Sequence, residues 1–297
     1  MSFNVYYSPE YANAGYAFDT TRKSKWLADS LMSNPIHGLK LHKPTLASDA
    51  ELELAHSKDY VRAVKTGNPI GLAQSQGFNW DANLATSVLY STSGVVCAAL
   101  DAMNRRSVSG SLSSGLHHAR RGRGAGFCTF NGLAVAAKVA ANNGCDSVLI
   151  LDFDAHCGGG TAEIIAGDDR IKQIDLSTNS FDCYESTEQA RLWITKGNYL
   201  RAVRSALKEA GKLNPELVLY NAGMDVHCRS SIGGHPGVEN HVIEKRERFV
   251  FEFFRSRGIP VAFVLAGGYS GKSPNVLSES ELTELHRMTC VEASKHV

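Results

Sequence analysis

The sequence lacks an excess of charge of either sign. Its 31 basic and 30 acidic residues leave a formal net charge of +1 over 297 residues. A chain this close to neutrality has no overall field that would favour a nucleic acid, an anionic membrane surface or a strongly acidic partner. We therefore expect no direct nucleic acid binding.

Paired cysteine motifs and long apolar runs are also missing. The seven cysteines are odd in number and never form a C-x-x-C motif. This usage fits reduced thiols in a cytosol better than a disulfide framework or a structural zinc site. The N-terminal stretch MSFNVYYSPEYANAG has no basic segment followed by an apolar one, and no run of membrane-spanning length stands out. We expect a cytoplasmic protein that does not contact a membrane.

Short apolar runs alternate with longer segments of helical spacing. The apolar runs resemble buried parallel strands, because they are rich in branched residues and do not clearly alternate. They lie at residues 3–8, 147–151, 216–223 and 260–268. The helical segments lie at residues 49–67, 83–106, 131–144, 198–212 and 240–258. This alternation predicts an α/β protein with an open parallel sheet flanked by helices. No linker or repeat divides the chain, so we expect one domain over residues 1–297.

Polar side chains follow these runs at the edge where parallel sheets bind ligands. The run VLILD ends at Asp152 and continues into Asp154 and His156, and the run ELVLYNAG is followed by Asp225. Residues two apart in an extended chain point to one face, so the first three side chains converge. Carboxylates with imidazole suit Zn²⁺ or Fe²⁺, and three protein ligands with an open position are typical of catalytic zinc. Asp152 is either a fourth ligand or an acceptor for a histidine.

Other motifs add candidate catalytic groups. His117 and His118 lie in a glycine-rich loop that can approach a ligand closely, and Phe127 lies beside that loop, where its ring could wall a substrate slot. Tyr269 follows two glycines at the end of a run, where a phenol could donate to a developing oxyanion. Each has an ordinary structural alternative: surface histidines, a core phenylalanine and a packed turn tyrosine. His227, two residues beyond Asp225, is interpreted as loop structure.

The ordered set GLHHARRGRGAGFCTFN, LDFDAHCGGGT, NAGMDVH and LAGGYSG resembles the histone deacetylase family. That family includes acetoin-utilisation proteins and acetylpolyamine amidohydrolases. The resemblance spans roughly residues 4–272 and implies an arginase-like α/β fold. It also implies a metal-dependent amidohydrolase, a deacetylase that removes an acetyl or short acyl group from an acylated amine. The substrate could be acetyl-lysine in a protein, an acetylpolyamine or a small N-acyl metabolite. The sequence is also compatible with an oligomer.

The resemblance implies roles for individual residues. Asp154, His156 and Asp225 match the family's metal ligands, which implies Zn²⁺, with Fe²⁺ as the alternative. His117 and His118 match its tandem histidines, of which the second is usually the general base and then the general acid.

Further roles follow from the same resemblance. Asp152 matches the carboxylate that pairs with the first histidine, and Tyr269 matches the tyrosine that stabilises the tetrahedral intermediate. Phe127 matches one aromatic wall of the acyl-lysine channel, with Gly126 and Gly268 as neighbouring substrate contacts. Backbone carbonyls around the metal-binding strand end form a monovalent cation site in the family, which makes K⁺ a candidate structural ion.

Two departures from the family pattern bear on catalysis. After the metal-binding histidine the family usually has H-G-[DN]-G, whereas this chain has Cys-Gly-Gly-Gly at 157–160. Gly159 replaces the Asp or Asn that orients the second tandem histidine, so either another residue supplies that contact or His118 is weakened. The second channel wall is also replaced, by LSTNSFDCYEST, in which Tyr184 and Phe181 are the candidates. Cys157 is interpreted as a buried, inert thiol, with a redox-sensitive thiol as the alternative.

Two other functions stay open. An arginase-like ureohydrolase would need more aspartates around its metals, notably a carboxylate two residues beyond His156, where Gly158 stands. A catalytically weak or silent protein that uses its metal to bind an acyl ligand would be consistent with Gly159. The intact metal ligands, His118 and Tyr269 favour catalysis over this alternative.

Overall fold

A computed structural model describes residues 2–14 and 19–297, in which eight strands form one parallel sheet. The strands are β1 (Phe3–Tyr6), β2 (Leu39–His42), β3 (Val108–Ser114), β4 (Val148–Asp152), β5 (Ile171–Ser177), β6 (Ala190–Ile194), β7 (Leu217–Ala222) and β8 (Val261–Leu265). Their order in the sheet is β2-β1-β3-β8-β7-β4-β5-β6, and every paired neighbour runs parallel. The predicted open α/β sheet is confirmed.

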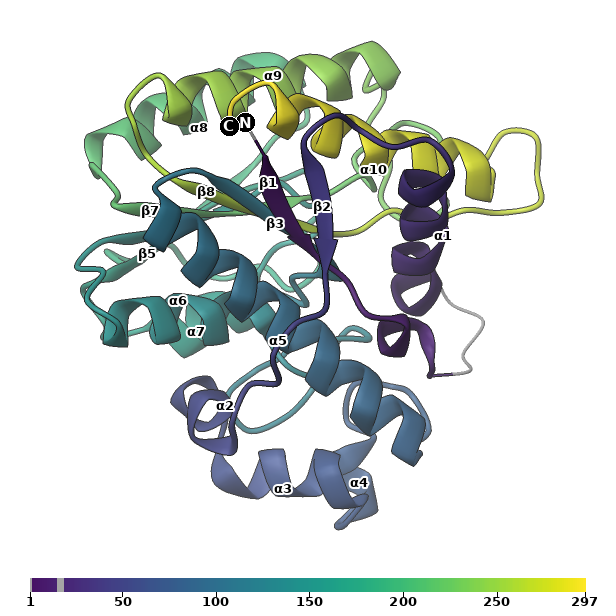
Figure 1. The fold of residues 1–297 in the computed structure, drawn as a ribbon, viewed down its shortest axis with the longest axis vertical. Coiled ribbons are helices and arrows are strands. Elements are labelled where there is room, and N and C mark those ends of the chain that lie inside the picture. The colour runs from purple at the N-terminus through teal and green to yellow at the C-terminus, as the bar shows by residue number, and fades with distance from the viewer. Residues whose placement is uncertain (1, 15–18) are drawn as a thin grey trace.

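Helices cover both faces of this sheet (Figure 1). They are η1 (Pro9–Ala12), α1 (Asp19–Ser33), α2 (Asp49–Ala55), α3 (Lys58–Thr66), α4 (Ile70–Ala73), α5 (Ala82–Arg105), α6 (Gly132–Asn142), α7 (Gly159–Ile165), α8 (Tyr199–Lys212), α9 (Asn240–Arg255) and α10 (Glu279–Ser294). Helices α1, α8, α9 and α10 pack on one face, and α5 and α6 pack on the other. Helices α2 and α3 pack against α6 and α5, respectively, and α4 packs against α3.

Strand β4 shows why the apolar runs do not alternate. Leu149 and Leu151 point into the apolar layer beneath α8 and α9, whereas Val148 and Ile150 point into the layer beneath α5 and α6. Both faces of the strand are therefore buried, and every position is apolar until Asp152.

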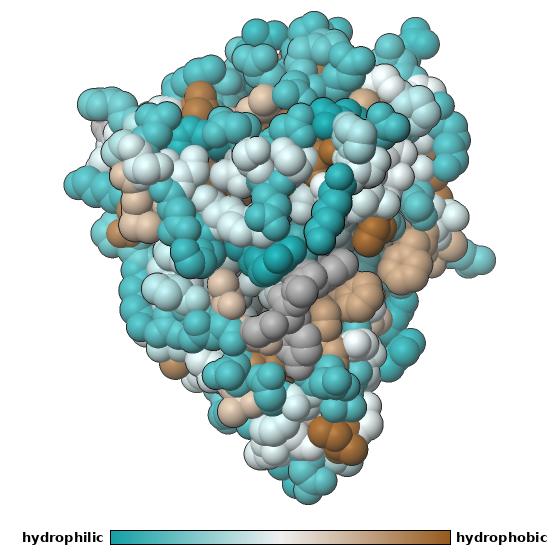
Figure 2. All heavy atoms as spheres, turned by 90° about the vertical axis from the view of Figure 1, so that its right-hand side faces the viewer, coloured by the Kyte–Doolittle hydropathy of each residue, from teal (hydrophilic) through white to brown (hydrophobic). Residues whose placement is uncertain are grey.

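Helix α5 is an exception to the expected absence of long apolar segments. By length and composition alone it could cross a membrane, and it is the one such helix among the described residues. However, 67% of its apolar window is buried inside the fold, as in the core helix of a globular protein. The face of the molecule in Figure 2 is mostly hydrophilic, with hydrophobic side chains gathered only in small groups.

The segment 49–67, predicted as one helical stretch, is two helices. Ser48 begins α2 in a capping box with Glu51, and Ser57 begins α3 by accepting a hydrogen bond from the Tyr60 amide. His56 between them has an extended backbone, which ends the first helix. Two side-chain caps so close together stabilise two short helices better than one continuous helix.

The topology brings four strand ends together. Strands β3, β8, β7 and β4 are consecutive neighbours in the sheet. The segments that follow their carboxyl ends carry the tandem histidines, Tyr269, Asp225 and the Asp154–His156 pair, respectively. Candidate groups from distant parts of the sequence therefore meet at one edge of the sheet.

Candidate active site

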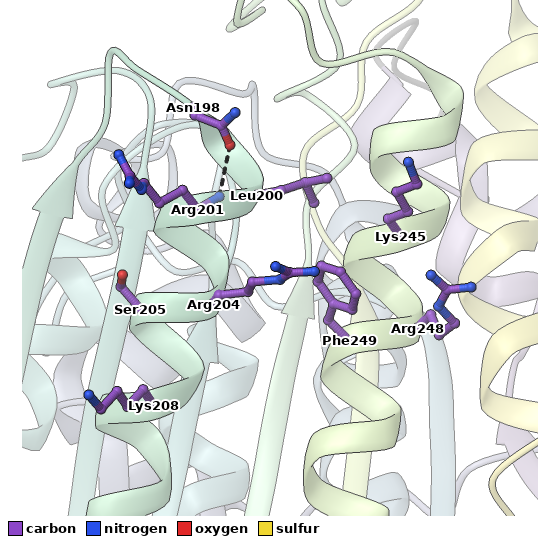
Figure 3. A pocket seen from close by; sticks show the side chains of 9 residues that line it. All are labelled: Asn198, Leu200, Arg201, Arg204, Ser205, Lys208, Lys245, Arg248 and Phe249. Carbon is purple, nitrogen blue, oxygen red and sulfur yellow. Dashed lines mark hydrogen bonds between the residues drawn. The ribbon is translucent and has the colours of Figure 1, made fainter.

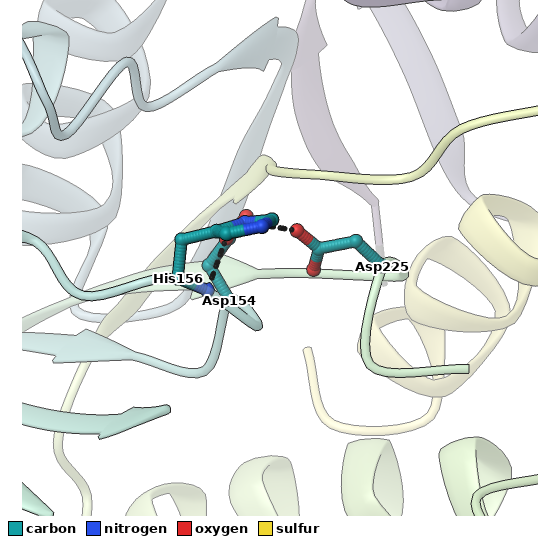
Figure 4. A group of neighbouring side chains, drawn as sticks. All are labelled: Asp154, His156 and Asp225. Carbon is teal, nitrogen blue, oxygen red and sulfur yellow. Dashed lines mark hydrogen bonds and ion pairs between the residues drawn. The ribbon is translucent and has the colours of Figure 1, made fainter. Parts of the chain in front are cut away.

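Three buried side chains form a candidate metal centre beyond β4 and β7. The donor atoms of Asp154, His156 and Asp225 lie within 4.8 Å of one another (Figure 4). The Nδ1 atom of His156 lies 3.1 Å from Oδ1 of Asp154 and 3.0 Å from Oδ2 of Asp225. The structure thus brings together the three ligands expected from the sequence.

Backbone amides hold the two carboxylates in place. The Gly267 amide donates to Oδ2 of Asp154 at 2.6 Å, and the Ala155 amide donates to Oδ1 of Asp225 at 2.9 Å. Oδ2 of Asp225 is buried, and it faces Nδ1 of His156 in an ion pair. A Cβ atom at Gly267 would overlap the Asp225 carboxylate and lie 2.5 Å from Oδ2 of Asp154, so only glycine fits there. A preformed pair of carboxylates with an imidazole fits a divalent cation of the Zn²⁺ or Fe²⁺ type.

The charges of this centre also suit a cation. Burial and the nearby charge of Asp154 raise the pKa of Asp225 to about 6. Burial would lower the pKa of His156, but hydrogen bonds to Asp154 and Asp225 outweigh it and raise that pKa to about 11. The imidazole therefore holds a proton between two carboxylates, and a bound dication would replace this proton.

The tandem histidines lie beside this centre and differ in charge. Nδ1 of His117 is 2.7 Å from Oδ2 of Asp152, whose other oxygen accepts a hydrogen bond from Asn221 at 2.8 Å. Burial lowers the pKa of His117, but the charges of Asp152 and Asp154 outweigh it and raise that pKa to about 10. Burial and then the charge of His117 lower the pKa of His118. The first imidazole is therefore cationic and the second is neutral near pH 7.

The Nδ1 atom of His118 has a partner that the sequence reasoning missed. It lies 2.9 Å from Oδ2 of Asp182, in the segment between β5 and β6. The Gly160 amide donates to the same oxygen at 3.2 Å, and the Arg120 guanidinium pairs with Oδ1. The family resemblance pointed to position 159 for this contact, and no motif marked Asp182.

A small cavity lies beside the tandem histidines and the candidate ligand Asp154. Its lining includes His117, His118, Asp154, Gly126 and Tyr269, and its volume of about 30 Å³ can hold a water molecule. Burial, with the charges of Asp225 and Asp154, raises the pKa of Tyr269 well above its usual value, so the phenol keeps its proton.

Lys23 of α1 is a second residue that the sequence reasoning missed. It also lines this cavity, and its ammonium group donates to the backbone oxygen of Ala266. Burial lowers the pKa of Lys23 to about 8.

Two exposed aromatic rings lie near the cavity. Phe127 is 42% exposed, with its ring centroid 5.2 Å from that of Phe78. Phe181 is 53% exposed, and its ring centroid lies 5.0 Å from that of His118. The Tyr184 hydroxyl instead accepts a hydrogen bond from Gln173. Of the two candidates for the second channel wall, Phe181 is the one that contacts a tandem histidine.

The remaining candidates have structural roles that the packing explains. A Cβ atom at Gly126 would lie 2.6 Å from the His118 ring, so glycine lets the loop approach the histidine. The same atom at Gly268 would meet Leu282 of α10, and Gly268 does not line the cavity. His227 bonds to Asn240 through Nε2 and to the Arg229 amide through Nδ1, as expected of a loop residue.

The cysteines form no disulfide in the described structure. All seven are free, and they are Cys97, Cys128, Cys145, Cys157, Cys183, Cys228 and Cys290. Burial raises the pKa of Cys157 to about 12, and its thiol donates to the backbone oxygen of Asn179 at 3.2 Å. A protonated, buried thiol of this kind is a weak nucleophile.

A larger hollow of about 710 Å³ lies elsewhere, between α8 and α9 (Figure 3). Its basic lining residues are Arg201, Arg204, Lys208, Lys245 and Arg248. It contains none of the candidate catalytic groups, so cavity volume alone would not locate the active site.

Comparison with known proteins identifies the family. The model of the histone deacetylase domain matches residues 17–285. An uncharacterized protein of Picosynechococcus sp. is 29% identical, covering 97% of this chain and 98% of its own length. Histone deacetylase 2 of Arabidopsis thaliana is 28% identical, and the match covers 80% of this chain and 65% of that protein. The acetoin utilization protein AcuC of Staphylococcus aureus is 30% identical, and the match covers 68% of this chain and 59% of that protein. The chain belongs to the histone deacetylase family.

Solved structures show the same fold. The HDA15 HD domain has a TM-score of 0.83 at 19% identity, covering 99% of this chain and 89% of that domain. An acetylpolyamine aminohydrolase from Burkholderia pseudomallei has a TM-score of 0.77 at 16% identity, covering 99% of both chains. The predicted arginase/deacetylase-like architecture is confirmed.

Proposed function

We propose that this protein is a metal-dependent deacetylase that hydrolyses the amide bond of an acetylated or short-chain acylated amine. The observation that carries the proposal is the position of the tandem histidines and Tyr269, which share a water-sized cavity with the metal-ligand candidate Asp154. Membership of the histone deacetylase family supports the same reaction. Residues 1–297 would form one such catalytic domain, and a cytoplasmic location and a structural K⁺ ion stay predictions.

Asp154, His156 and Asp225 would hold a Zn²⁺ or Fe²⁺ ion, which when bound supplies Lewis-acid activation of the amide carbonyl and of water. His118 would accept the proton of the attacking water at Nε2, because its Nδ1 atom faces Asp182 and its low pKa keeps it neutral. One of the two histidines, once protonated, would deliver a proton to the leaving amine. Asp152 keeps His117 in its cationic form for this step.

Tyr269 would donate its phenol proton in a hydrogen bond to the oxygen that becomes negative when the amide carbonyl is attacked. A donor that is fixed before the reaction costs no reorganisation in the transition state. The exposed rings of Phe127 and Phe181 would flank the acylated amine as it enters.

The competing functions have less support in this geometry. A silent acyl-binding protein was favoured by the loss of the orienting residue at Gly159, but the Asp182 carboxylate contacts His118 from another segment. An arginase-like site would need an added carboxylate at Gly158. A Cβ atom there would lie 2.8 Å from Oδ2 of Asp152, which leaves no room for a side chain.

Acetate release tests the proposal. The purified protein would be reconstituted with Zn²⁺ or with Fe²⁺ under anaerobic conditions, and assayed on an acetyl-lysine peptide and on an acetylpolyamine. We expect turnover that a chelator abolishes and that the same metal restores, and the ratio of kcat/KM values would rank the substrate classes. The Asp154→Asn variant is the matched control, because it loses one ligand charge at nearly constant volume. Stoichiometric metal binding without hydrolysis of either substrate or of their short-chain acyl analogues would contradict the proposal.

A further inference from the structure

The general base of the proposed reaction lacks the orienting residue that the family places after the metal-binding histidine. An imidazole can act as a base at one nitrogen only if the other nitrogen holds the proton, and a fixed acceptor next to that other nitrogen selects this tautomer. We infer that Asp182, from the segment between β5 and β6, is the positioning residue of His118 and takes over the role that Gly159 cannot perform. This inference rests on the proposed function.

The contact has the geometry that the role requires. Oδ2 of Asp182 lies 2.9 Å from Nδ1 of His118, and the Asp182 side chain is only 9% exposed. An ionised carboxylate can only accept, so the His118 proton stays on Nδ1. Nε2 is then free of a proton, and it lies on the side of His117, 3.2 Å from Nε2 of that residue. The unprotonated nitrogen is therefore the one beside the first tandem histidine, His117, and both imidazoles line the water-sized cavity.

The two possible positions for an orienting side chain exclude each other. A Cβ atom at Gly159 would overlap the backbone oxygen of Asp182 and lie 2.7 Å from its Oδ1 atom. Asp182 itself has a φ of +58°, in the left-handed region that aspartate tolerates better than most residues. Glycine at 159 and this backbone conformation at 182 are therefore parts of one arrangement, in which the acceptor enters from a different segment.

Arg120 holds the carboxylate from its other side. Its guanidinium pairs with Oδ1 of Asp182 and, at 2.8 Å, with Oε2 of Glu163. His118 and Arg120 belong to the same loop. Two side chains of this loop therefore contact the two oxygens of the Asp182 carboxylate. The Gly160 amide adds a hydrogen bond at 3.2 Å to Oδ2. These three contacts restrict the rotation of the carboxylate, and a positioning residue must be held in one orientation in this way.

Kinetics of two variants test the inference. We expect Asp182→Ala to lower kcat by roughly 10²–10³-fold while KM changes less than about threefold, because His118 is no longer held in the tautomer and orientation of a base and the substrate contacts remain. Asp182→Asn should retain more of the activity, because the amide oxygen can still accept from Nδ1. Formate should partly restore the Asp182→Ala variant in a saturable way by filling the space that the carboxylate leaves. Glu185→Ala, which removes an exposed carboxylate from the same segment, is the control and should match the wild type.

A measurement that needs no turnover separates this inference from the proposed function. The ¹⁵N chemical shifts of the His118 ring in the metal-loaded protein report which nitrogen carries the proton. We expect Nδ1 to be protonated in the wild type and a mixture of tautomers in Asp182→Ala, with metal content and circular dichroism unchanged. An unchanged tautomer, or a kcat within threefold of the wild type without formate rescue, would overturn the role of Asp182. Absence of turnover in the wild type with the expected tautomer would contradict only the proposed function.

Discussion

Replacing Tyr269 with phenylalanine removes one hydroxyl group from the cavity and leaves the ring in place. Burial and the charges of Asp225 and Asp154 raise the pKa of this phenol, so it is a hydrogen-bond donor at any ordinary assay pH. Loss of one such donor to a developing oxyanion costs about 2.7–4 kcal/mol of transition-state stabilisation. We therefore expect kcat to fall by roughly 10²–10³-fold in Tyr269→Phe. KM should change little, because the ground-state carbonyl gains little from the same contact.

The assay compares kcat and KM of wild type and variant at matched metal content. Tyr60→Phe is a suitable control, since Tyr60 is also buried and its hydroxyl donates to the backbone oxygen of Thr129 at 2.7 Å. The control should lose about 1 kcal/mol of stability and keep its kcat. If Tyr269→Phe loses less than tenfold in kcat, or if KM carries most of the loss, the oxyanion role is refuted.

Three further expectations follow from the same structure. Zn²⁺ at a free concentration of 100 times its Kd should stabilise the chelated protein by about 2.7 kcal/mol, seen as a higher Tm, and Asp225→Asn should abolish most of this gain. Burial lowers the pKa of His56 to about 4, so the unfolded chain binds more protons between pH 6.5 and pH 4. Stability should therefore fall by about 3 kcal/mol as the pH decreases through this window, and urea midpoints should show a flatter profile for His56→Gln. Phe181→Ala should raise KM by up to about tenfold with a smaller effect on kcat, because an exposed ring of this kind contributes about 0.5–1.5 kcal/mol to a contact. A KM equal to that of the wild type would remove Phe181 from the channel wall.

The centre of the sheet was predictable because its strands are apolar on both faces. Strands β4, β7 and β8 are buried along their whole length, and each lies within an apolar run of the sequence. Strand β5 was not predicted, although it is almost fully buried, because Gln173 and Asp175 interrupt its apolar pattern. Burial, with the charge of Asp152, raises the pKa of Asp175 to about 8, and its Oδ2 atom accepts a hydrogen bond from the Gly158 amide at 2.7 Å. A strand that supports the active-site loop with polar side chains does not have the composition of a core strand.

The candidate metal centre was also predictable, because its ligands follow strand ends at fixed spacing. The two-residue spacing of Asp154 and His156 predicted that they converge; in the structure both lie in the bend that follows β4, and the sheet order brings Asp225 next to them. The acceptor for His118 obeys no such local rule. It has only to place an oxygen about 3 Å from Nδ1, and any segment that passes that point in space can supply it. Asp182 does so through a left-handed backbone and an ion pair with Arg120, and both depend on tertiary contacts. Glycine at position 159 therefore indicates only that the orienting side chain is absent from that position of the sequence. In the folded protein, Asp182 lies against Gly159 and contacts His118 instead.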